Sequence, residues 1–176
     1  MTPTVRDAAR DDMRAITALY AHEVLHGTAT YERQPPDEAQ MWYRHGELVQ
    51  AGFPYLVASI DGAFAGYAYA SAYRARASYR WTCECTVYVA PQLRGRGAGR
   101  ALLGALVERC TQRGWRQMIA VIGDETNLAS VGLHQALGFQ KAGRFPGLGR
   151  KHGRWLDALQ FQRALGDGAT TAPDED

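Results

Sequence analysis

A short segment rich in glycine and arginine, residues 94–100, has the composition of an anion-binding site. It reads Arg-Gly-Arg-Gly-Ala-Gly-Arg and lies between a predicted strand and a predicted helix. Glycines let the backbone approach a ligand closely, and the first N–H groups of a helix lack internal partners and carry partial positive charge. The arginines add full charges. The segment therefore predicts a pocket for an anionic ligand, with a tight turn that uses its glycines only for geometry as the alternative.

Two well-known phosphate-binding loops do not match this segment. The loop of nucleoside triphosphatases requires Lys and then Ser or Thr after its last glycine, whereas Gly99 is followed by Arg100 and Ala101. The dinucleotide fingerprint requires G-x-G-x-x-G, and the spacing here is G-x-G-x-G. A nucleotide-binding module is therefore disfavoured.

Two side chains of the sequence are candidates for proton transfer. Glu84 lies in the middle of a predicted strand, where an inward-facing carboxylate is costly unless it meets polar groups or water. His134 lies on a predicted helix, and an imidazole exchanges protons near neutral pH. The alternatives are a solvent-facing strand residue for Glu84 and a packed or capped side chain for His134.

Two arginines predict a site for an acidic substrate. Arg74 and Arg76 are two residues apart on what is expected to be a strand, so they would share one face. Paired guanidinium groups bind a carboxylate or phosphinate well. An ordinary charged sheet edge is the alternative.

The elements that must position these residues follow from hydrophobic periodicity and turn signals. The predicted helices and strands are arranged around one sheet, which predicts a mixed α/β fold in a single domain over residues 1–165. Residues 166–176 have nothing to bury and are expected to form a disordered tail. The predicted helices span residues 11–25, 37–51, 99–113 and 127–137, and the predicted strands span 55–60, 64–73, 81–89, 117–123 and 155–165.

Composition excludes several classes of protein. The chain has 176 residues, of which 46% are hydrophobic, and a net charge of +2, so a wholly disordered chain and a large nucleic-acid-binding face are both disfavoured. No apolar run is long enough for a membrane span, and the N-terminus lacks the features of a secretory signal, which predicts a cytoplasmic protein. Three cysteines cannot all pair, and no His or Cys cluster has zinc spacing, so no metal is expected.

Two motifs resemble those of the GCN5-related N-acetyltransferases (GNAT family). Arg94-x-x-Gly97-x-Gly99 resembles the family's pyrophosphate-binding loop. The family's second conserved sequence motif is similar to the downstream segment that contains Asn127-x-x-Ser130, His134 and Leu137-Gly138-Phe139. This resemblance implies a mostly antiparallel sheet, flanked by helices, in which a splayed strand pair holds acetyl-CoA. The cofactor-binding residues it implies are Val87, Tyr88, Val89, Arg94, Gly95, Arg96, Gly97, Ala98, Gly99, Arg100, Asn127 and Ser130.

A closer resemblance covers nearly all of residues 4–165. Segments such as Thr28-Ala29-Thr30-Tyr31-Glu32 and Lys151-His152-Gly153-Arg154-Trp155 are similar to phosphinothricin and methionine sulfoximine acetyltransferases. This implies Glu84 as the catalytic base, His134 as the residue that protonates the leaving thiolate, and a homodimer. It also implies substrate contacts from Arg74, Arg76, Thr28 and Tyr31.

The predicted function is N-acetylation of a small amino acid analogue such as phosphinothricin, methionine sulfoximine or methionine sulfone, by direct attack on acetyl-CoA. A peptide or protein N-terminus, or a polyamine, is the alternative acceptor. A non-catalytic acyl-CoA sensor is a third possibility, and the joint presence of Glu84 and His134 disfavours it.

Overall fold

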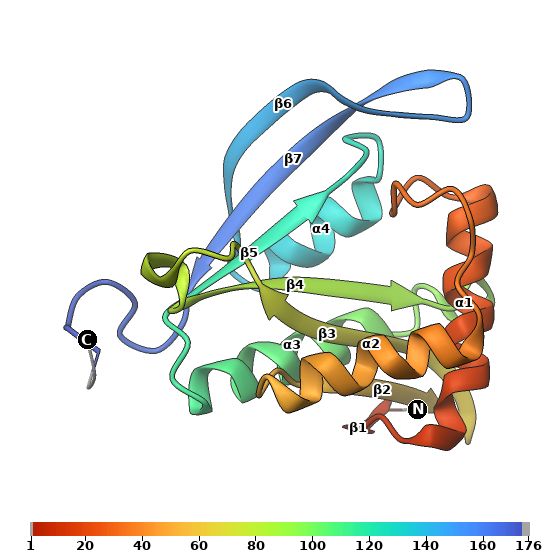
Figure 1. Ribbon diagram of the computed structural model, residues 1–176, viewed down its shortest axis with the longest axis horizontal. Helices are drawn as coiled ribbons and strands as arrows, with labels where there is room; N and C mark the ends of the chain where they lie inside the picture. The colour runs from red at the N-terminus through yellow and green to blue at the C-terminus, as the bar shows by residue number, and fades with distance from the viewer. Residues whose placement is uncertain (1, 174–176) are drawn as a thin grey trace.

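The computed structural model describes residues 2–173 and contains one sheet with helices on both of its faces (Figure 1). The four α-helices are α1 (Met13–His26), α2 (Glu38–Gln50), α3 (Ala98–Gln112) and α4 (Leu128–Ala136). The strands are β1 (Thr4–Asp7), β2 (Tyr55–Ile60), β3 (Ala63–Ala72), β4 (Thr82–Val89), β5 (Gln117–Ile122), β6 (Gln140–Lys151) and β7 (Arg154–Ala164). The mixed α/β prediction is confirmed.

The order of strands in the sheet is β1-β2-β3-β4-β5-β7-β6. All neighbouring strands are antiparallel except β4 and β5, which are parallel. A parallel pair requires a crossover, and here α3 makes it between β4 and β5. The anion-binding segment lies at the start of this crossover.

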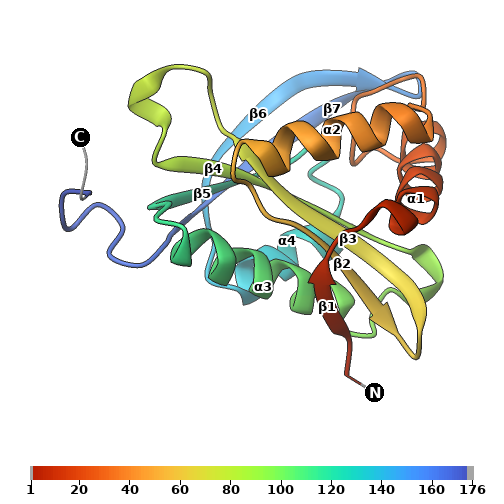
Figure 2. The same cartoon turned by 60° about the horizontal axis from the view of Figure 1, so that its bottom comes forward.

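Side chains alternate between the two faces of the sheet along each strand, so the protein has two hydrophobic cores, one on each face. On one face, α1 and α2 pack Met13, Ile16 and Met41 against side chains of β2 and β3. On the other face, Leu102, Leu103 and Leu106 of α3 are fully buried, together with side chains of β4 and β5. Figure 2 shows α1 and α2 on the opposite side of the β2–β3 part of the sheet from α3. Fully burying a leucine contributes roughly 1.5–3 kcal/mol, so each core fixes its helices firmly against the sheet.

Two strands of the sheet were not among those expected from the sequence, β1 and β6. Strand β1 has only four residues, too few for a periodic signal. Strand β6 contains Gly143, Pro146, Gly147 and Gly149, residue types that are depleted in strands. Proline is tolerated because β6 is an edge strand that pairs only with β7, and its register shifts twice along that pairing.

The end of the chain follows β7. Of the segment predicted to be disordered, residues 166–173 are described and form turns, in which Arg116 donates hydrogen bonds to the Thr171 hydroxyl and the Ala172 carbonyl. Residues 174–176 lie outside the described residues. None of the helices within residues 2–173 has the length and apolar character needed to cross a membrane.

Candidate active site

A cleft opens where β4 and β5 separate. The two strands pair from Thr82 with Gln117 to Cys85 with Ala120, and beyond that register they diverge toward their carboxyl ends (Figure 1). Residues 86–89 of β4 therefore pair with β3 but have no β5 partner within the described chain. The cleft has a volume of about 910 Å³, within the usual range for a small-molecule site. Its walls include backbone groups free to pair with an extended ligand.

One end of the cleft is formed by the glycine-rich segment and the N-terminus of α3. Gly95 and Gly97 have φ angles of 75° and 88°, in the left-handed region that favours glycine. Helix α3 begins at Ala98, directly after this turn, so its unpaired N–H groups lie at the cleft. The combination of turn and helix terminus makes this end electropositive.

The three arginines of this segment have different surroundings. Arg94 pairs with the buried Glu23 of α1 at 2.8 Å, and Arg96 pairs with Asp61 at 3.3 Å. Arg94 and Arg100 line the cleft, whereas Arg96 lies outside it. Arg100 has no carboxylate partner within residues 2–173, which leaves its charge available to a bound anion. The cofactor role of Arg96 remains a prediction from resemblance.

Glu84 lines the cleft from the face of β4 that carries Tyr88. Its side chain is half-buried, and this burial raises the pKa of the carboxyl above its ordinary value. The neighbouring Cys83 and Cys85 point to the opposite face and are buried in the core. A carboxylate with a raised pKa holds a proton more readily than an exposed one, as a general base must.

His134 reaches the cleft from the other face of β4. Its Nδ1 donates to the Ser130 carbonyl oxygen at 2.8 Å, which fixes the tautomer of the neutral ring and directs Nε2 toward the Cys85 sulfur, 3.8 Å away. Burial lowers the pKa of the imidazole, partly offset by the Ser130 bond. Glu84 and His134 thus lie on opposite sides of the strand that lines the cleft.

Asn127 caps α4 next to this histidine. Its side-chain oxygen accepts a hydrogen bond from the Ser130 N–H at 3.1 Å. An amide side chain has a separate NH₂ group, which this cap leaves for a ligand in the cleft. Asn127 therefore combines a structural role with a candidate binding role.

Thr28 and Tyr31 belong to a loop, residues 27–31, that forms another wall of the cleft. The Thr28 hydroxyl donates to Asp124 at 2.8 Å and the Tyr31 hydroxyl donates to the Gly123 carbonyl at 2.6 Å. Both hydroxyls thus bond to the turn after β5. The substrate contacts expected of these two residues remain predictions.

Arg74 and Arg76 do not line the cleft. The prediction that they share a strand is wrong, because β3 ends at Ala72 and both residues lie in the irregular segment that follows. Both side chains are exposed, and Arg74 stacks on Tyr73 and Tyr79. The predicted strand 64–73 ends within one residue of β3, so the error lay in extending its alternation to Arg74 and Arg76 beyond that end.

The cleft brings together most of the residues predicted from the sequence. It also contains two acidic residues that were not predicted from the sequence, Glu23 and Asp124. Asp124 could have been found as a carboxylate between a strand and a helix, where Asp commonly bonds the backbone two residues ahead. Among residues 2–173, no group of His, Cys, Asp or Glu side chains is placed to hold a metal ion. The predicted residues that line the cleft are Thr28, Tyr31, Glu84, Val87, Tyr88, Val89, Arg94, Gly95, Gly97, Ala98, Gly99, Arg100, Asn127, Ser130 and His134.

Comparison with known proteins identifies relatives over the whole fold. A family model described as the acetyltransferase (GNAT) family matches residues 13–139. A phosphinothricin N-acetyltransferase from Alcaligenes faecalis is 51% identical over 171 residues, which cover 97% of this chain and 87% of that protein. An L-methionine sulfoximine/L-methionine sulfone acetyltransferase from Pseudomonas paraeruginosa is 40% identical, with 98% of this chain and 100% of that protein covered.

A solved structure agrees with these relatives. The crystal structure of a GNAT superfamily phosphinothricin acetyltransferase from Sinorhizobium meliloti, in complex with AcCoA, superposes with a TM-score of 0.96 at 51% identity. The match covers 99% of this chain and 95% of that one. With the family model, the relatives and the splayed β4–β5 cleft in agreement, the chain belongs to the GNAT family of acetyltransferases.

Proposed function

We propose that this protein transfers the acetyl group of acetyl-CoA to the amino group of a small amino acid analogue, such as phosphinothricin, methionine sulfoximine or methionine sulfone. The observation that carries the proposal is the cleft itself, in which an anion-binding helix terminus, free strand backbone and the half-buried Glu84 line one space. The similarity to enzymes named for these acceptors supports the choice of substrate.

The cleft fits acetyl-CoA by the chemistry of its groups. The N–H groups of residues 97–100, with the Arg100 guanidinium, suit a pyrophosphate. The unpaired backbone of Val87 and Val89 suits the amides of a pantetheine arm, which would add to β4 as a strand does. When bound, acetyl-CoA supplies an acetyl group activated as a thioester.

Glu84 and His134 divide the proton transfers between them in this proposal. Glu84 takes a proton from the acceptor's ammonium group, since only the neutral amine is a nucleophile. His134 keeps its Nδ1 proton on the Ser130 carbonyl, so Nε2 of the neutral ring is unprotonated and first accepts the proton that the acceptor nitrogen loses as the C–N bond forms. Nε2 then donates that proton to the departing thiolate, which returns the ring to its neutral form. Direct attack needs no covalent enzyme intermediate, and the buried Cys83 and Cys85 have no role in it.

A panel of acceptors tests the proposal and its alternatives. Purified protein with acetyl-CoA should release CoA in a saturable manner with phosphinothricin, methionine sulfoximine and methionine sulfone. Ordinary amino acids, a polyamine and an N-terminal peptide should give a kcat/KM at least about tenfold lower, because a site built for a polar group rejects analogues that leave its own polar groups unpaired. Preference for the peptide or the polyamine would overturn the proposed acceptor, and cofactor binding without turnover would indicate a sensor.

We also propose that the protein forms a homodimer through β6 and β7. These two strands end the sheet and extend beyond the helices (Figure 1). Phe145, Leu148 and Trp155 on these strands are exposed, and Trp155 retains 67% of its accessible surface. Exposed apolar groups gathered on one hairpin are typical of an interface, and a second copy of the chain supplies a self-complementary surface. The free thiols of Cys83, Cys85 and Cys110 support a cytoplasmic location for this dimer.

Substitution of Trp155 tests the interface. Wild-type protein is expected to sediment with the mass of a dimer, and Trp155→Glu should shift it to monomer at micromolar concentration, because a charge replaces the largest exposed apolar side chain of the hairpin. Tyr43→Glu is the matched control, since Tyr43 is equally exposed but lies on α2. A monomeric wild type, or equal effects of both substitutions, would contradict the proposed interface.

A further inference from the structure

Four hydrogen bonds join the loop formed by residues 27–31 to the C-terminal half of the chain, and two more join it to α1, through the Tyr20 hydroxyl and the Glu23 carbonyl. Besides the bonds of Thr28 and Tyr31, the Lys151 ammonium donates to the Thr30 carbonyl at 2.8 Å, and His152 Nε2 donates to the Gly27 carbonyl at 3.1 Å. All five residues of the loop line the cleft. The shape of this wall therefore depends on contacts with residues 92 to 125 positions away in the sequence.

The Tyr31 ring shows how closely the loop is seated. A methyl group on Gly149 would overlap that ring, and one on Gly123 would lie 3.1 Å from it. The ring thus packs against backbone on both sides, from β6 and from the turn after β5. This close fit requires the turn to be held in one position.

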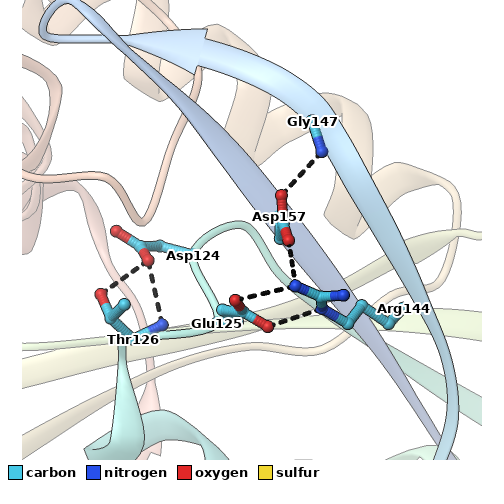
Figure 3. Close-up of polar contacts among 6 residues, drawn as sticks. All are labelled: Asp124, Glu125, Thr126, Arg144, Gly147 and Asp157. Atoms are coloured by element: carbon cyan, nitrogen blue, oxygen red, sulfur yellow. Dashed lines mark hydrogen bonds and ion pairs between the residues drawn. The ribbon is translucent and has the colours of Figure 1, made fainter.

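Asp124 is the residue of this turn that bonds to the loop. Only 4% of the surface of this residue is exposed. One carboxylate oxygen accepts from the N–H and hydroxyl of Thr126, at 3.0 and 2.7 Å, as Figure 3 shows. The other accepts from the Thr28 hydroxyl at 2.8 Å and from Arg154 of β7 at 2.6 Å. With both oxygens occupied, Asp124 is a fixed acceptor and not a group free to bind substrate.

We infer that Asp124 is a positioning residue for the acceptor substrate. It joins Thr28 to Arg154 and so holds loop 27–31 against the turn after β5, which keeps one wall of the cleft closed. This inference rests on the proposed function, because it assigns loop 27–31 to the acceptor side of the acetyl transfer. The donor side is formed by other elements, β4 and α3.

Glu125 provides a matched control in the same turn. Its carboxylate pairs with Arg144 of β6, which also bonds to Asp157 of β7, and Asp157 accepts from the Gly147 N–H at 2.7 Å (Figure 3). This group is more exposed and faces the β6–β7 hairpin, with no bond to loop 27–31. Removing the charge of Glu125 thus changes the same turn but leaves the bonds of Asp124 to Thr28 and Arg154 intact.

The substitution Asp124→Asn tests the role of this carboxylate. The amide has a single acceptor oxygen and no charge, so it cannot accept both from Thr126 and from the Thr28–Arg154 pair, and its attraction to Arg154 is weaker. We expect KM for the acceptor to rise about 10- to 100-fold, the usual effect of losing hydrogen bonds to a buried charge, while KM for acetyl-CoA stays within about twofold. Glu125→Gln should leave both KM values within about twofold.

A double-substitution cycle separates this role from general loss of stability. Thr28→Val removes the same hydrogen bond from the loop side and should raise the acceptor KM in the same direction. The double variant Asp124→Asn/Thr28→Val should have the same acceptor KM as Asp124→Asn alone, since both substitutions remove the same hydrogen bond. Additive effects, or equal rises in both KM values, would overturn the inference.

Amide hydrogen exchange gives a readout that needs no acceptor. Asp124→Asn should increase exchange in residues 27–32 while the core helix α3 stays protected, and Glu125→Gln should not. Failure of the acceptor panel with this exchange pattern intact would overturn the proposed function but keep Asp124 as the anchor of the loop. Unchanged exchange in Asp124→Asn would overturn the positioning role itself.

Discussion

Glu84→Gln should lower kcat by roughly 10²–10⁴-fold, the usual contribution of general acid–base catalysis, while acetyl-CoA affinity stays within about threefold. The glutamine side chain keeps the size and polarity of Glu84 but cannot take a proton from the acceptor's ammonium group. Steady-state rates with methionine sulfone, together with calorimetric binding of acetyl-CoA, measure both quantities. Glu108→Gln, an exposed change on α3, controls for the loss of one charge.

The pH dependence of this variant separates base catalysis from a structural effect. Burial raises the pKa of Glu84, so this carboxyl becomes protonated at a higher pH than an exposed one. As the pH is lowered, the wild-type rate should therefore begin to fall earlier than it would with an ordinary carboxyl as the base. The variant can use only acceptor whose amine is already neutral. Its rate should therefore rise with pH as the fraction of neutral amine increases, and level off above the pKa of the acceptor's amino group. The ratio of wild-type to variant rate should therefore shrink as pH increases. A ratio that stays constant with pH would contradict the base role.

Gly66→Ala should destabilise the fold by about 3 kcal/mol or more, a decrease in the melting temperature of roughly 6–12 °C. Gly66 lies in β3 opposite Val89, with φ at 154°, next to the irregularity in the β2–β3 register. A methyl group there would overlap the Tyr88 carbonyl oxygen and lie 3.0 Å from the Val89 Cα. Because the obstacle is backbone, no side-chain rotation relieves the clash.

Gly104→Ala is the matched control for this substitution. Gly104 lies within α3, and a methyl group there meets nothing within 4 Å. Alanine is the better helix former, so this change should stabilise the protein by about 0.5–1 kcal/mol. Thermal denaturation of both variants checks the opposite signs, and equal behaviour would contradict the close approach of β3 and β4 at Gly66.

The sequence could predict those parts of the fold whose pattern is local. Helix α3 was predicted to within one residue at each end, because its leucines repeat with helical period and Gly114 follows it with φ at 92°. The start of α2 was predicted from Pro35, Pro36 and Asp37, and Asp37 indeed caps it by accepting from the Gln40 N–H. The cofactor end of the cleft was predictable for the same reason, since residues 94–97 form a turn that leads directly into α3.

Features that depend on distant contacts could not be predicted. Strand β6 owes its conformation to pairing with β7 and carries little hydrophobic pattern of its own. The segment after β3, which carries Arg74 and Arg76, turns away from the sheet once the pairing of Ala72 with Cys83 of β4 ends. Asp124 acquires its role only because the fold brings Thr28 and Arg154 to it from either side.

Mass spectrometry of the reaction products can follow acetyl transfer from acetyl-CoA to the acceptor's amino group. Purified protein, acetyl-CoA and phosphinothricin are incubated together, and free CoA and acetylated acceptor are measured in the same samples. We expect acetylation on the acceptor's amino nitrogen, with one CoA released for each amine acetylated, and loss of both signals in Glu84→Gln. Release of CoA without an acetylated amine, or acetylated amine formed equally well by Glu84→Gln, would contradict the proposed function.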